Sequence, residues 1–199
     1  MADSDPATST DEGSAGAPIT GDQKGGHRRR GRRWPWITGT VVAAVIIAAV
    51  GDTVLRDEEL DDVLDLIEES EDIQTAANER LDEIADEIDT AEGSGPARRR
   101  YADRSFEAAT DLLVVIEELE DETVLPWHRS VDRARDRYLE HAGAWLDRYE
   151  ASAAERDEPA DTSVRIVATW ELAEDALHGA TSPYLGRGDN DRIDRIFAG

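Results

Sequence analysis

The sequence of 199 residues predicts an all-α protein, in which a single N-terminal transmembrane helix is followed by an antiparallel bundle of about four helices. Three observations support this fold class. A long uncharged run directly follows a block of basic residues, and apolar residues recur every three or four positions through the rest of the chain. No segment alternates apolar and polar residues as a half-buried strand does, so helix packing is the economical architecture.

The uncharged run covers residues 34–51, with the sequence WPWITGTVVAAVIIAAVG. A helix of this length rises by roughly 27 Å, which approaches the ~30 Å hydrocarbon core of a bilayer. Trp34 and Trp36 stand at its start, and tryptophan is enriched at membrane–water interfaces. Because Val54 and Leu55 can extend the apolar stretch, we predict a transmembrane helix over residues 34–55.

Two other interpretations of this run remain open. A cleaved secretory signal would use the small residues Ala49 and Gly51 before its cleavage site. The run begins far from Met1, however, which is late for such a signal. A buried core helix can be equally apolar, but it has no need for a basic block in front of it. An uncleaved signal-anchor accounts for both the late start of the run and the basic block in front of it.

Basic residues before the run predict its orientation, because positive charge near a membrane span is retained on the cytoplasmic side. In the fifteen residues after the run, Arg56 is the only basic residue. The N-terminus is therefore expected in the cytoplasm, with the C-terminal domain on the outer side of the plasma membrane. The residues that carry this prediction are Lys24, Arg28, Arg29, Arg30, Arg32 and Arg33.

Composition differs on the two sides of the run. Residues 1–33 are predicted to be a disordered cytoplasmic tail that ends in the basic block, because the part before the block is rich in small and polar residues and has no aromatic side chain. Residues 56–199 form the predicted outer domain. From Asp52 onward the chain has 41 acidic and 16 basic residues, which excludes nucleic acid as a partner of this domain. Lysine is nearly absent, arginine is the main basic residue and Asp outnumbers Glu, a bias that leaves a GC-rich bacterial or a halophilic origin open.

The first helix of the outer domain carries a heptad-like pattern from residue 60 to residue 91, and the Gly-Pro-rich segment 93–96 ends it. Polar Ser70 and Gln74 interrupt the apolar positions in the middle. This seam is a candidate surface for coiled-coil association with a second chain. Its apolar members are Leu60, Val63, Ile67, Leu81, Ile84 and Ile88.

The remaining helices follow the same periodicity. A second helix is predicted over residues 97–120, with its stretch LLVVI as the most buried part of the domain, and a third from about Thr123, with Pro126 in its first turn. One long helix bent at Pro126 is an alternative. A fourth helix is expected to start near Asp161 or Thr162 and to end at Gly179, followed by a last short turn.

No arrangement of catalytic residues, metal ligands or cofactor-binding motifs is found in the sequence. There is no cysteine, no glycine-rich phosphate loop and no Gly-x-Ser-x-Gly motif. Among the histidines, Asp175–His178 alone approximates the Glu-x-x-His motif of di-metal bundles, and it lies near a helix end. His128 and His141 are assigned to helix surfaces or to contacts with aromatic neighbours.

The sequence therefore predicts a protein that is not an enzyme and needs no cofactor. Its expected partners are the lipid bilayer and either another envelope protein or a second copy of the chain. The alternative is a ligand-binding or lipid-binding sensor domain, with an apolar pocket lined by Tyr138, Trp145 and Trp170.

Overall fold

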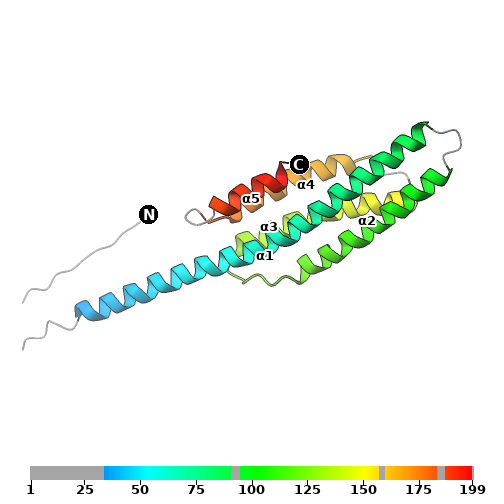
Figure 1. Cartoon of the computed structure of the whole chain (residues 1–199). Helices are drawn as coiled ribbons and strands as arrows, with labels where there is room; N and C mark the ends of the chain where they lie inside the picture. Colours follow the sequence, from blue (N-terminus) through cyan, green and yellow to red (C-terminus); the bar gives the residue numbers. More distant parts are fainter. Residues whose placement is uncertain (1–33, 91–94, 157–159, 183–186, 199) are drawn as a thin grey trace, which may run out of the picture. The chain divides into compact units, whose positions relative to one another are not determined.

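The structure, a computed structural model, describes residues 34–90, 95–156, 160–182 and 187–198, with side chains from residue 42 in the first helix and from residue 188 in the last (Figure 1). The described residues form five helices and no strand, which confirms the all-α class. The chain divides into two units, residues 1–42 and 43–199, and the helical bundle belongs to the second. The predicted tail and its basic block lie outside the described residues.

Helix α1 (Trp34–Thr90) is one helix of 57 residues that contains both the uncharged run and the heptad-like seam. Within the residues whose side chains are described, no helix is both long enough and apolar enough to be a candidate membrane span. Residues 34–41 of the predicted span, with the side chains of Trp34 and Trp36, lie outside that part of the structure.

Four further helices follow α1: α2 (Gly95–Asp121), α3 (Arg129–Ala153), α4 (Thr162–Ala180) and α5 (Arg187–Phe197). Within residues 43–199, successive helices run in opposite directions (Figure 1). Side-chain contacts agree with this order. Glu59 of α1 lies beside His128 and Asn78 lies beside Tyr149, so α1 and α3 are parallel. The second unit is therefore an up-and-down helical bundle.

The predicted boundaries hold for α2 and α4 but not for α3, which begins at Arg129. Residues before it form a connection that is closed by a hydrogen bond from the His128 amide to the Leu125 carbonyl. Proline disfavours helical geometry in the residue that precedes it, so Leu125 does not begin a helix that continues through Pro126. The alternative of one helix bent at Pro126 is wrong. Trp127 is 63% exposed in this connection.

The heptad-like seam packs inside the bundle. Its first residues are fully buried together with Ser70 and Gln74, whereas Ile84 and Ile88 near the helix end are half-buried. Their neighbours in the core come from α2, α3, α4 and α5. Because the chain's own helices cover this seam, a second chain cannot reach it while the bundle is intact. The fully buried or nearly buried apolar members are Leu60, Val63, Ile67 and Leu81.

The stretch LLVVI of α2 is less buried than predicted. Leu112, Val115 and Ile116 enter the core, but Leu113 and Val114 are 42% and 51% exposed. In a bundle of this kind α2 is covered on one side only, so a helix segment that is apolar all round keeps part of its circumference outside.

The short helix α5 docks on α1 through an apolar contact and an ionic one. Ile193 is fully buried in the core, while the guanidinium of Arg192 donates to both carboxylate oxygens of Glu68, at 2.9 and 2.7 Å, and to Asp65 at 2.6 Å. This hydrogen bonding lowers the pKa of Glu68 and raises that of Arg192. The expected last turn is thus a helix of 11 residues that packs on the bundle.

Replacement of Arg192 by methionine is expected to loosen α5, because it leaves Glu68 without its bidentate partner and Asp65 without a donor at a position where the arginine is only 16% exposed. A loss of about 2 kcal/mol in local stability corresponds to roughly 30-fold faster amide hydrogen exchange. This loss is measured by hydrogen exchange of the α5 amides in R192M. The control is Arg195→Met, at an exposed position of the same helix. Equal exchange rates in the two variants would contradict this account of docking.

Candidate functional site

A cluster of polar side chains lies between α1 and α3 in the interior of the bundle. The Tyr138 hydroxyl donates to Glu71 Oε1 at 2.6 Å, and the Gln74 amide nitrogen donates to Ser70 Oγ at 3.1 Å. His141, one turn along α3 from Tyr138, is 1% exposed, with its Nε2 atom 3.8 Å from Glu71 Oε1. That separation is too long for a hydrogen bond.

Burial shifts the proton affinities of this cluster in opposite directions. Desolvation raises the pKa of Glu71 to about 7, although hydrogen bonds from Tyr138 and Gln74 oppose the shift. Desolvation also lowers the pKa of His141 to about 4. At neutral pH the imidazole is therefore uncharged and Glu71 titrates close to the ambient pH. A largely buried carboxyl whose pKa lies near neutrality is a typical feature of functional sites.

Sequence reasoning missed this cluster. Glu71 was not singled out among the acidic residues of this helix, and His141 was assigned to a helix surface or to an aromatic contact. The structure buries His141, with its ring 5.0 Å from that of Trp170 and 5.8 Å from that of Tyr138, so the aromatic contact is confirmed and the surface position is wrong. One signal was available: Glu71 follows Ile67 by four positions, which places it beside the buried seam.

A second feature is the outward face of α2. Phe106 is 67% exposed and, like Leu113, lines a groove of about 510 Å³ between α2 and α3, whose other wall includes Leu146. Val114 adds to the exposed apolar surface. Phe106 and Leu113 are seven residues apart and lie on one face of the helix. Exposed apolar surface that is contiguous along a helix marks an interaction site more often than scattered single residues do.

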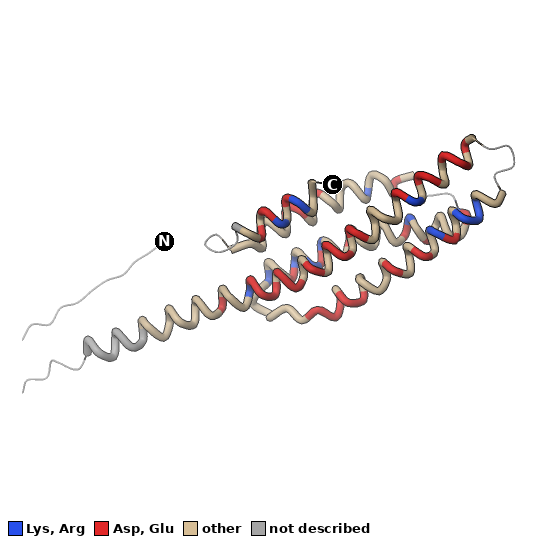
Figure 2. The backbone as a smooth tube through the Cα atoms, in the orientation of Figure 1, with Lys and Arg blue, Asp and Glu red and all other residues tan. Residues whose placement is uncertain are grey.

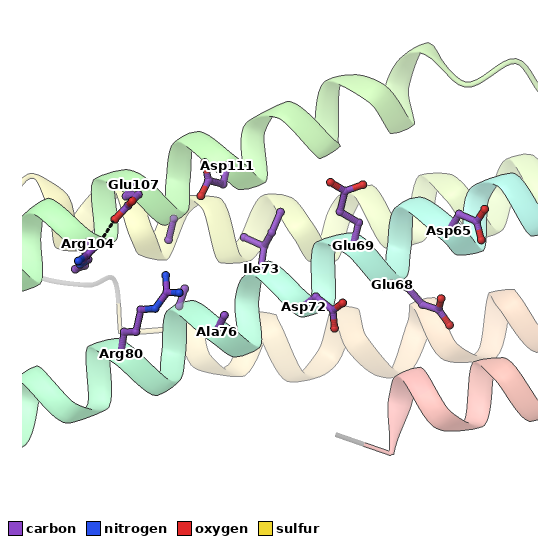
Figure 3. A pocket seen from close by; sticks show the side chains of 12 residues that line it. Asp65, Glu68, Glu69, Asp72, Ile73, Ala76, Arg80, Arg104, Glu107 and Asp111 are labelled. Carbon is purple, nitrogen blue, oxygen red and sulfur yellow. Dashed lines mark hydrogen bonds and ion pairs between the residues drawn. The ribbon is translucent and has the colours of Figure 1, made fainter.

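A groove of about 630 Å³ runs along the other side of α2, between α1 and α2 (Figure 3). Its apolar floor includes Ile73, Ala76 and Ala108. Its walls are strongly acidic, as the density of Asp and Glu along α1 and α2 also shows (Figure 2). The charged residues that line it are Asp65, Glu68, Glu69, Asp72, Arg80, Arg104, Glu107 and Asp111.

Only part of this acidic charge is balanced by neighbouring cations. Arg192 neutralises Glu68 and Asp65 from outside the groove, and Arg104 pairs with Glu107 within it. In Figure 3, Glu69 of α1 and Asp111 of α2 reach into the space between the two helices. Among the residues that the structure describes, neither has an ion pair with a cation. The groove thus keeps a negative potential over an apolar floor.

No family model, curated protein or solved structure matches this chain. Among the described residues, no group of three or more histidine and acidic side chains could hold a metal ion.

Proposed function

We propose that this protein is a single-pass membrane-anchored interaction protein, whose outer helical bundle binds a basic amphipathic helix of another envelope protein. The observation that carries the proposal is the outward face of α2, with exposed apolar residues between an apolar groove and an acidic one. The anchor and the docking face rest on separate arguments.

The anchor is supported by the exposure of apolar residues early in α1. Val45, Ile46 and Ile47 are 62%, 57% and 72% exposed. Three consecutive residues point in directions about 100° apart, so together they cover most of the helix circumference. A helix that exposes valine and isoleucine on every side needs an apolar surrounding, and a bilayer supplies it.

A tryptophan near the end of the uncharged run supports the same proposal. Asp52 is the first charged residue after this run, and the Trp127 indole donates to its carboxylate at 2.9 Å. The Trp127 ring is exposed, and an exposed indole at this level suits the boundary between lipid and water. The basic block before the run then favours a cytoplasmic N-terminus.

Charge favours one of the two partners that the sequence left open. A second copy would bring the same excess of 41 acidic over 16 basic residues to the contact. Like charges at an interface oppose association, whereas a helix with basic residues beside an apolar face complements both grooves. We therefore place a basic partner ahead of self-association.

The test uses the full chain in lipid nanodiscs and a labelled model peptide that forms a basic amphipathic helix. Charge reversal by Asp111→Arg is expected to weaken binding about tenfold, because it places a cation on the groove wall. Glu171→Arg on α4 is the matched control, since it changes the net charge equally at an exposed position outside both grooves. Leu113→Asp tests the apolar contact in the same way.

Equal losses in D111R and E171R would mean that binding follows overall charge and would contradict the proposed surface. A concentration-dependent dimer of the full chain that Phe106→Asp dissociates would instead assign this face to self-association. Sedimentation of the full chain without peptide separates these outcomes.

A further inference from the structure

A cavity of about 230 Å³ lies at the edge of the buried polar cluster, between α1, α3 and α4. Its walls are mainly apolar and include two indole rings, those of Trp145 and Trp170. Glu71, Gln74 and His141 of the polar cluster also line this cavity. Of the three residues that the sequence-based alternative placed around an apolar pocket, Trp145 and Trp170 line this cavity. Tyr138 does not line it and instead lies behind its wall, where it donates to Glu71.

Two hydrogen-bond acceptors beside this cavity lack a donor. Gln74 Oε1 and His141 Nε2 are buried and have no hydrogen-bond partner in the structure. The Gln74 amide nitrogen is engaged with Ser70 and Tyr138, which identifies the oxygen as the unpaired end. An unsatisfied buried acceptor is costly in a folded protein and calls for an explanation.

The hydrogen bonds of His141 identify the role of its Nε2 atom. Nδ1 lies 3.2 Å from Thr169 Oγ1, and that hydroxyl donates to the backbone carbonyls of Arg165 and Ile166, at 2.8 and 3.0 Å. The hydroxyl proton is therefore used, and Nδ1 must be the donor to Thr169. A neutral imidazole then presents a lone pair at Nε2.

We propose that this cavity binds a small organic primary amine, whose ammonium group donates hydrogen bonds to His141 Nε2 and Gln74 Oε1 while its apolar body lies against Trp145 and Trp170. The site is independent of the docking face proposed above. Neither acceptor is exposed to solvent, so side chains of the cavity wall must move before the ligand reaches them.

Three properties of the site favour an amine over other ligands. Both unpaired groups are acceptors, which an ammonium can satisfy and a carboxylate cannot. Glu71 supplies a carboxyl beside them, and indole faces attract cations. A cavity of about 150 Å³ holds a benzene molecule, so a ring with a short aminoalkyl chain matches the present volume.

The test measures binding of 2-phenylethylamine to the full chain in lipid nanodiscs by calorimetry and tryptophan fluorescence, with empty nanodiscs subtracted. Val167, 58% exposed, lines the cavity, and Val164, 70% exposed on the same helix, does not. Val167→Phe is expected to weaken binding at least about tenfold by filling the entrance, and Val164→Phe to leave it unchanged. His141→Leu removes one acceptor and is expected to cause a similar loss, with circular dichroism to verify its folding.

The proposal is supported if the amine binds saturably, V167F weakens this binding and V164F does not, and phenylacetate binds much more weakly than the amine. Equal binding of phenylacetate would overturn the assignment of the two acceptors. Absence of saturable binding up to about 10 mM amine, or equal losses in V167F and V164F, would overturn the site itself. In those cases bound water satisfies the two acceptors.

Discussion

Replacement of His141 by glutamine is expected to make the bundle lose stability as the pH rises from 5 to 7, and replacement of Glu71 by glutamine is expected to do the opposite. The folded protein keeps a proton on Glu71 up to a pKa of about 7, whereas the unfolded chain releases it near 4.5. Folding then takes up a proton, so the free energy of unfolding falls with rising pH.

The pKa of His141 has the reverse effect. It is about 4 in the folded protein against 6.5 in the unfolded chain, so folding releases a proton and stability rises with pH between these values. In the unmodified protein the two slopes largely cancel over their common range. Either substitution removes one of these two pH dependences and leaves the other. The free energy of unfolding then changes by about 3 kcal/mol over two and a half pH units.

The two shifts should persist in the single variants, because their main cause is burial. Tyr138 and His141 of α3 and Asp72 of α1 are the titratable groups nearest to Glu71; neither Glu71 nor His141 is a cause of the other's shift. The measurement is urea unfolding of the full chain in a mild detergent, followed by circular dichroism above the isoelectric point of about 4.4. Parallel curves for H141Q and E71Q would contradict the burial of both groups.

Replacement of Ile67 by alanine is expected to destabilise the bundle by about 2 to 5 kcal/mol, whereas the same change at Ile88 costs about 1 kcal/mol. Both residues belong to the heptad-like seam. Ile67 is fully buried among the chain's own helices, and Ile88 is half-buried close to the end of α1. Truncation in the core removes apolar contact and leaves a cavity, while the end of the helix can relax.

Denaturant unfolding at several protein concentrations tests the intramolecular role of the seam. A midpoint that does not depend on concentration, together with unequal losses in I67A and I88A, supports it. An unfolding midpoint that rises with protein concentration, and that no longer does so in I67A, would show that the seam joins two chains.

Local patterns in the sequence were sufficient for the helix class and for most boundaries. The helical periodicity and the Gly-Pro-rich segment predicted the end of α1 and the bounds of α2, and the start of α4 lies at Thr162 as expected. The predicted helix over residues 34–55 and the seam helix from residue 60 are, however, one continuous helix. These features depend on neighbours within a few positions, through backbone hydrogen bonds, capping and the restrictions of proline and glycine. The start of α3 was misplaced because proline is tolerated in a first helical turn and also ends a preceding one.

Tertiary structure alone decided what the helix faces contact. Periodicity defined the seam of α1 but could not say whether it packs against this chain or another, since both remove the same apolar surface from water. Likewise, Glu71 and His141 are separated by 70 positions, and no local signal pairs them. Their shifted pKa values and the cavity beside them arise because packing of α1 against α3 and α4 withdraws these groups from water.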